Sequence, residues 1–114
     1  EFSTISILVS EFYMIKSFSS SVAPNDFVAK VTEALSTREL GKIVSMKTQE
    51  NEIVISFNKL GKSDVVFVIT EDNGGFKCTH KSEKIAMTHK MLRNDIEGKL
   101  VKILENLGAQ VSNN

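Results

Sequence analysis

The fold is decided between residues 41 and 82, where the chain reads GKIVSMKTQENEIVISFNKLGKSDVVFVITEDNGGFKCTHKS. Apolar and polar residues alternate through Ile53, Ile55 and Phe57, which predicts a strand with one buried face. Short polar connectors, above all Asn73-Gly74, favour tight turns between successive strands. The stretch therefore predicts an antiparallel meander of four strands. We expect them at residues 42–48, 52–58, 64–70 and 76–82.

The third of these strands differs from its neighbours in pattern. Residues 65–69 are apolar without interruption, so neither face alternates with polar side chains. Such a run is typical of a central strand that is covered on both faces. We therefore expect this strand in the middle of the sheet.

Helices are predicted on either side of the meander. Pro24 suits a first helical turn, and we expect that helix to end near Leu40 with Gly41 as a left-handed stop, or to break at residues 37–39. The last helix is predicted over residues 89–107, between Thr88 as N-cap and Gly108 after its end. Its apolar stripe has helical spacing. The stripe consists of Leu92, Ile96, Leu100, Ile103, Leu104 and Leu107.

Together these elements predict an α+β fold in the order β-α-β-β-β-β-α. Its first strand is expected at residues 13–21. The curved antiparallel sheet would have about five strands, with both helices on one face and the long C-terminal helix in its hollow. One domain is predicted over residues 14–110. Residues 1–13 read as a leader or a cloning remnant, and residues 111–114 as a frayed tail.

Composition narrows the functional classes. Lys and Arg number 14, as do Asp and Glu, and this balance argues against a general polyanion binder. The single cysteine, Cys78, cannot form an internal disulfide and fits a reducing, cytoplasmic compartment. No apolar run approaches the length that crosses a membrane.

The element order resembles a shortened START-like, or helix-grip (SRPBCC), domain. The resemblance is carried by residues 14–21, by Ala23-Pro24-Asn25-Asp26-Phe27-Val28, by residues 49–82 and by residues 89–107. It implies a curved sheet that grips the last helix and encloses a ligand cavity. The order is also similar to that of secretion-chaperone-type domains, which act as dimers on other chains. Neither resemblance assigns a role to a single residue.

Methionine and phenylalanine supply the strongest candidate site. Their soft and aromatic side chains suit either an apolar ligand cavity or a partner surface. The alternative is an ordinary close-packed core. The candidates are Met14, Phe18, Phe57, Phe67, Met87 and Met91.

A basic group near the end of the meander gives a second candidate. With nearby aromatics it would form a nucleic-acid platform. The alternative is a solvated outer sheet face, where lysines also prevent edge pairing. The group consists of Lys77, Lys81, Lys84, Lys90 and Arg93.

Catalytic and metal chemistry have weaker support. Cys78 and His80 share a strand face and would begin a zinc site or a nucleophile pair, but no further ligand or base completes either. We therefore expect no metal, no cofactor and no enzymatic activity. The predicted function is a small binding module for an apolar ligand or a protein partner, with nucleic-acid binding or a chaperone-like dimer as alternatives. A homodimer is also expected from the two open sheet edges.

Overall fold

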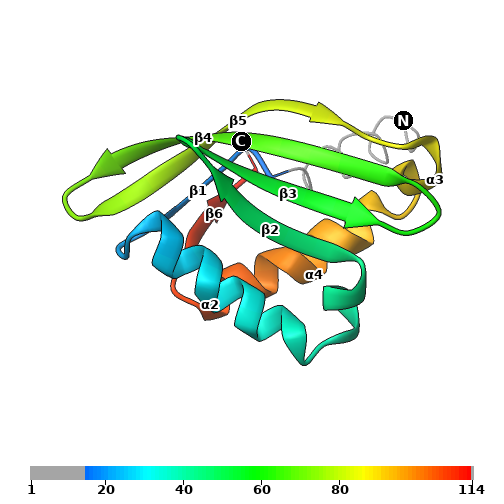
Figure 1. Cartoon of the computed structure of the whole chain (residues 1–114), viewed down its shortest axis with the longest axis horizontal. Coiled ribbons are helices and arrows are strands. Elements are labelled where there is room, and N and C mark those ends of the chain that lie inside the picture. Colours follow the sequence, from blue (N-terminus) through cyan, green and yellow to red (C-terminus); the bar gives the residue numbers. More distant parts are fainter. Residues whose placement is uncertain (1–14, 114) are drawn as a thin grey trace, which may run out of the picture.

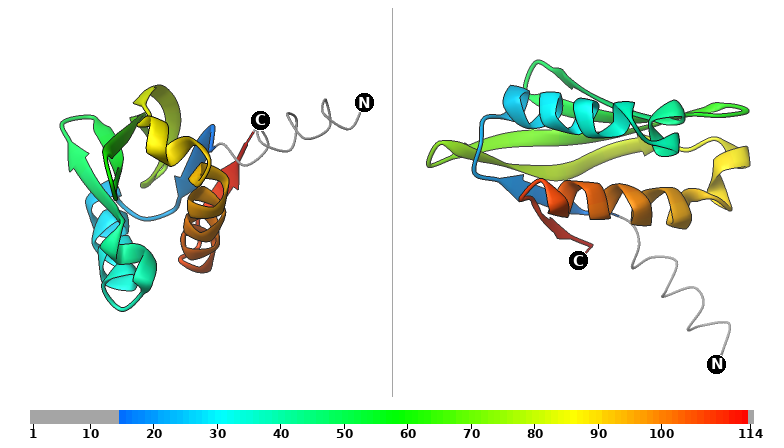
Figure 2. Two further views of the ribbon diagram at one scale, coloured as in Figure 1. Left: turned by 90° about the vertical axis from the view of Figure 1, so that its right-hand side faces the viewer. Right: turned by 90° about the horizontal axis from the view of Figure 1, so that it is seen from below.

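The computed structural model describes residues 15–113 and shows one antiparallel sheet with two long helices on the same face (Figure 1). Its elements are β1 (Ser17–Ser20), α2 (Pro24–Ser36), the 3-10 helix η1 (Glu39–Lys42), β2 (Val44–Gln49), β3 (Glu52–Asn58), β4 (Lys62–Asp72), β5 (Gly75–Lys84), α3 (Met87–Lys90), α4 (Arg93–Asn106) and β6 (Gln110–Ser112). The strands lie in the order β2-β3-β4-β5-β1-β6. The sheet curves so that α2 and α4 lie on its concave face, α2 against β2 and α4 near β6 (Figure 2).

The predicted meander is confirmed. Strand β3 has the bounds expected from its alternation, and it pairs antiparallel with β2 and β4. Strand β4 is central, as predicted, but only its concave face is covered. Val66 and Val68 point to the open face and stay partly exposed. An ion pair from Lys81 to Glu52, 2.5 Å long, spans β4 on that side.

The core fills the space between the sheet and the helices. Strand residues that face inward meet the buried stripe of α2, which consists of Phe27, Val31 and Leu35. From α4 the buried residues Leu100 and Leu104 close the other half. Aromatic rings link the two halves, because Phe18 and Phe67 pack edge to face with ring centroids 5.1 Å apart. The helix periodicity read from the sequence therefore identifies the core-facing residues of α4, but Leu92, which was predicted in the same stripe, precedes α4 and is 43% exposed.

The last described strand differs from the prediction. Of the tail expected over residues 111–114, Val111 and Ser112 belong to β6, which pairs antiparallel with β1 in the register Phe18 to Val111. Strand β1 in turn pairs with β5, so the sheet has six strands rather than about five. The three residues of β6 show no alternating pattern that would predict a strand from the sequence. They form a strand because they pair with β1. The edge strands are β2 and β6, and a homodimer through either edge stays a prediction.

The predicted C-terminal helix is split. The chain forms the short α3 and then α4, with Met91 and Leu92 between them. Thr88 does not cap a helix, because its hydroxyl donates to the Leu60 carbonyl at 2.9 Å. At the other end the prediction is right: Gly108 follows α4 with φ of 94°.

Gly41 has a different role from the predicted left-handed stop. The first helix ends at Ser36, and Gly41 lies inside η1. A Cβ at this position would lie 2.0 Å from the Leu35 carbonyl oxygen. Glycine is therefore required by close contact between backbones, and η1 folds back tightly on the end of α2.

Candidate functional site

The structure separates the predicted apolar site residues. Phe18, Phe57 and Phe67 lie in the core and are at most 1% exposed, whereas Met87 and Met91 are 81% and 94% exposed. Met14 lies outside the described residues. Because the phenylalanines are buried in the core and the methionines are exposed, these residues do not line a common cavity.

The space between α4 and the sheet is filled. The void there measures about 10 Å³ and is lined by core residues that include Phe57, Phe67 and Leu100. A single water molecule needs a space of roughly this size or slightly more. The ligand cavity implied by the helix-grip resemblance is therefore occupied by side chains.

Exposed apolar side chains gather at one end of the molecule. This apolar end consists of Leu60, Met87, Met91 and Leu92. Leu60 belongs to the β3–β4 turn and the others flank or belong to α3, which the Thr88 hydrogen bond holds against that turn. Figure 1 shows α3 beside this turn, so the four residues share one region.

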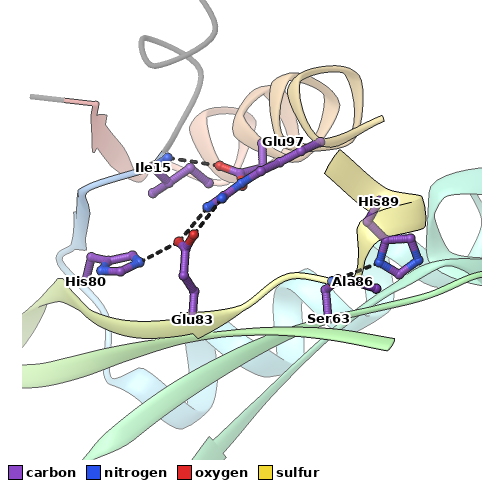
Figure 3. A network of polar contacts seen from close by, with 8 residues as sticks. Ile15, Ser63, His80, Glu83, Ala86, His89 and Glu97 are labelled. Carbon is purple, nitrogen blue, oxygen red and sulfur yellow. Dashed lines mark hydrogen bonds and ion pairs between the residues drawn. The ribbon is translucent and has the colours of Figure 1, made fainter. Parts of the chain in front are cut away.

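A buried serine–histidine pair fixes α3 to the meander (Figure 3). His89 lies with Nδ1 2.5 Å from the Ser63 hydroxyl and with Nε2 2.6 Å from the Lys59 carbonyl oxygen. The carbonyl can only accept, so Nε2 donates to it, and in the neutral ring Nδ1 then accepts the Ser63 proton. The Ser63 oxygen in turn accepts from the Ala86 N–H at 2.8 Å. Both side chains are at most 1% exposed, so the pair stabilises the turn and is closed to a substrate.

A second polar network joins the end of β5 to the start of α4 (Figure 3). The register shift between Val66 and Phe67 leaves Lys81 as an extra residue in β5. Beyond this bulge Glu83 pairs with Val65, on the same face as His80, and the His80 Nε2 lies 2.8 Å from a Glu83 oxygen. Without the bulge, Glu83 would point to the open face.

Arg93 connects this carboxylate to the core. Its two terminal nitrogens donate to the two oxygens of Glu83 at 2.7 Å each, and its Nε donates to Glu97. Glu97 is 2% exposed, and it also accepts from the Ile15 N–H at 2.9 Å. Burial by itself would lower the pKa of Arg93, but its hydrogen bonds with Glu83 and Glu97 raise that pKa above the usual value. The network therefore joins the segment just before β1, the end of β5 and the start of α4.

The Glu83 carboxylate makes the stability of the folded protein depend on pH in the acidic range. Its hydrogen bond from Arg93 lowers the pKa of Glu83 from 4.5 to about 2, against the opposing effect of burial. Because the folded-state pKa is depressed, this contribution is present above about pH 4.5 and is lost as the pH falls toward 2. We expect urea unfolding to show a steeper loss of stability across this window in the wild type than in Glu83→Gln. Equal slopes in the two proteins would contradict the assignment.

Cys78 lies in the core with 0% exposure, and burial raises the pKa of its thiol to about 12. A neutral thiol in this position is a small apolar core residue and a poor nucleophile. Within residues 15–113, no group of three or more His, Cys, Asp or Glu residues is placed to hold a metal ion. The Cys78–His80 pair on one strand face therefore belongs to the packing of the sheet.

The predicted basic group is divided by the fold. Arg93 was predicted to join the lysines, but its side chain is buried between two carboxylates on the concave side. Lys81 is paired with Glu52, while Lys77, Lys84 and Lys90 are exposed. The physical reason is the bulge at Lys81, which turns Glu83 inward to meet Arg93. The remaining lysines do not form the five-residue platform expected from the sequence.

A groove runs between η1 and α4 on the helical side of the molecule, with a volume of about 820 Å³. Its floor is apolar. Ile96 and Ile103 from α4 are buried there, and Leu40 in η1 and Ile43 at its end are partly exposed. Its rim is charged. The rim residues are Arg38, Glu39, Lys42, Lys59, Asp95, Lys99 and Lys102, with the amides Asn58 and Asn106. An apolar floor with a charged, exposed rim is the usual build of a recognition surface.

The sequence contains only part of the signal for this groove. Ile96 and Ile103 belong to the predicted apolar stripe of the last helix, but nothing in the sequence places Leu40 and Ile43 opposite them. That juxtaposition depends on the tight return of the chain at Gly41 and on the direction of α4.

Among the described residues, no helix combines the length and the apolar character needed to cross a membrane. No protein-family model, characterised protein or solved structure matches the chain. The resemblance to START-like domains accordingly stays a prediction. The groove between η1 and α4 is one candidate site, and a second hollow of about 770 Å³ lies along α4 near Ile15 and Val111.

Proposed function

We propose that this protein is a non-enzymatic module that binds a protein partner in the groove between η1 and α4. One contrast carries the proposal: the space under α4 measures about 10 Å³, whereas the groove beside it measures about 820 Å³ and has an apolar floor. Binding at the surface is therefore favoured over enclosure of a small molecule within the fold.

The openness of the groove favours a protein segment as the occupant. Arg38, Lys59 and Lys102 on its rim are exposed, so a bound segment would lie along the groove with one side in solvent. Such grooves typically accept the apolar face of an amphipathic helix from another chain. A small apolar ligand would leave the charged rim without a function.

Burial of the nucleophiles supports binding rather than catalysis. Ser63 and Cys78 are 0% exposed, and His89 is 1% exposed. The Ser63–His89 pair is held by hydrogen bonds to the Lys59 carbonyl and the Ala86 N–H, so it has a structural role already. A substrate would have to unfold α3 from the meander to reach it.

The proposal can be tested with a synthetic helix that carries leucine on one face and glutamine on the other. We expect this neutral peptide to shift the backbone amide resonances of Ile43, Ile96 and Ile103. Resonances around Leu60 and Met91, at the apolar end, should stay in place. Shifts confined to the apolar end, or no shifts at all, would contradict the proposal.

A matched pair of variants sharpens the test. Leu40→Glu places a carboxylate on the groove floor, and Leu60→Glu places the same charge on the apolar end, where the side chain is 84% exposed. Leu40→Glu should weaken peptide binding by about tenfold or more, because an unpaired charge would be desolvated on binding. Leu60→Glu should bind like the wild type. Titration calorimetry measures both, with circular dichroism to confirm that each variant is folded.

A further inference from the structure

The groove is more basic than the rest of the described surface. Among residues 15–113, five of the fourteen Lys and Arg residues line it, against two of the twelve Asp and Glu residues. The other described residues carry nine cations and ten anions, so the positive excess is concentrated in the groove. A positive groove on an otherwise balanced protein favours partners whose charge is negative at the contact.

Three of the five cations are available for such a contact. Lys42 lies 3.3 Å from Glu39, and Lys99 lies 3.1 Å from Asp95. Within residues 15–113, Arg38, Lys59 and Lys102 have no carboxylate at ion-pairing distance. They lie on η1's N-terminal side, on the β3–β4 turn and on α4, so they surround the apolar floor.

Backbone pairing at the groove indicates which kind of segment it accepts. The Asn58 N–H donates to the Ile43 carbonyl at 2.7 Å, and the Gly41 N–H donates to the Arg38 carbonyl at 3.1 Å. These backbone groups are thus bonded within the fold and cannot pair with an added strand. A segment in the groove must satisfy its own backbone hydrogen bonds, which a helix does.

From the floor, the charge and the backbone pairing, we infer that the groove binds an acidic amphipathic helix of a partner protein. Its apolar face lies on Leu40, Ile43, Ile96 and Ile103, and its flanking carboxylates meet Arg38, Lys59 and Lys102. This inference rests on the proposed function and adds the chemical class of the partner. The groove's charge contributes to partner choice and to the rate of association more than to the total affinity.

Three synthetic helical peptides, each with leucine on one face, test whether the charge of the peptide determines how tightly it binds in the groove. Their polar faces carry glutamate, glutamine or lysine. We expect the glutamate peptide to bind tightest and the lysine peptide weakest, with about tenfold between the outer two. Added salt should weaken the glutamate peptide and leave the glutamine peptide nearly unchanged.

Charge reversal at the groove needs a control with the same change in net charge. Arg38→Glu, Lys59→Glu and Lys102→Glu together should abolish the preference for the glutamate peptide. The control combines Lys47→Glu, Lys77→Glu and Lys84→Glu, all exposed residues of the sheet strands β2 and β5. It should keep the preference, because these lysines do not line the groove.

The outcomes separate the two proposals. Equal binding of all three peptides in the groove would overturn the acidic partner and leave the protein-binding function intact. Tighter binding of the lysine peptide, or loss of preference in both triple variants, would also overturn it. Failure of every peptide, together with one-to-one binding of dodecanoate in the groove, would overturn both and indicate an anionic lipid-like ligand.

Discussion

Replacing Arg93 with alanine should lower the free energy of unfolding by about 3–5 kcal/mol. The guanidinium group makes two hydrogen bonds with Glu83 and one with Glu97, and its side chain is 13% exposed. Without it Glu97 would remain a buried carboxylate whose other partner is the Ile15 N–H. An unpaired buried charge is among the most costly changes in a protein interior. Chemical denaturation at neutral pH measures the loss.

A surface pair on the same helix provides the control. Lys99 and Asp95 also form an ion pair, but both side chains are more than 60% exposed. Lys99→Ala should therefore change stability by no more than about 1 kcal/mol. The double variant Arg93→Leu with Glu97→Leu should retain more stability than Arg93→Ala alone, because no buried charge is left. If Arg93→Ala were as mild as Lys99→Ala, Glu97 would have to be hydrated rather than buried.

Replacing Phe67 with alanine should cost a similar amount, about 3–5 kcal/mol, by creating a cavity. Phe67 is 0% exposed at the middle of β4, with its ring centroid 5.1 Å from that of Phe18 and 5.8 Å from that of His80. Several elements meet at this ring, so the surrounding structure cannot collapse to fill the space. Thermal and urea unfolding should both report the loss.

The next residue of the same strand is the matched control for the core substitution. Val68 faces the open side of β4 and is partly exposed. Val68→Ala removes less buried surface and opens no enclosed cavity, so the expected loss is about 1 kcal/mol. Similar losses at the two positions would mean that the open face of the sheet is covered as the sequence first suggested.

Local patterns account for the parts of the fold that the sequence predicts well. Alternation gives β3 its observed bounds, and the turn at Asn73-Gly74 joins β4 and β5 as expected. Local sequence patterns do not predict the elements whose formation depends on tertiary contacts. Strand β6 exists because it pairs with β1, and the last helix breaks near Met91 where His89 turns inward to Ser63.

The candidate site was harder to predict than the fold. Met87 and Met91 were predicted to line either an apolar cavity or a partner surface, and their exposure leaves only the partner surface as a prediction for them. Arg93 was predicted on a basic surface, whereas its ion pair with Glu97, four residues further on, is largely buried. The spacing allows such a pair but does not predict burial, because Asp95 and Lys99 at the same spacing are exposed. The groove needs residues from η1 and α4 that no local pattern brings together. The type of each side chain indicated what chemistry it could perform. Its position in the structure depended on how the helices and strands pack against one another.

The strand order determines which parts of the sheet require distant segments of the chain to meet, and therefore where the entropy cost of loop closure falls. Within the meander, β2 pairs with β3, β3 with β4 and β4 with β5, so each of these pairings closes a loop of a few residues. The pairings of β1 with β5 and β6 instead join segments that are far apart in the chain, and so does the bond from Ile15, just before β1, to Glu97, 82 positions apart. Each doubling of loop length costs only about 0.6 kcal/mol of loop-closure entropy. The long closures are concentrated in one part of the molecule, around β1, β6 and the start of α4. The side of the sheet that carries α4 therefore depends on remote segments meeting, whereas the meander assembles from segments that are never far apart.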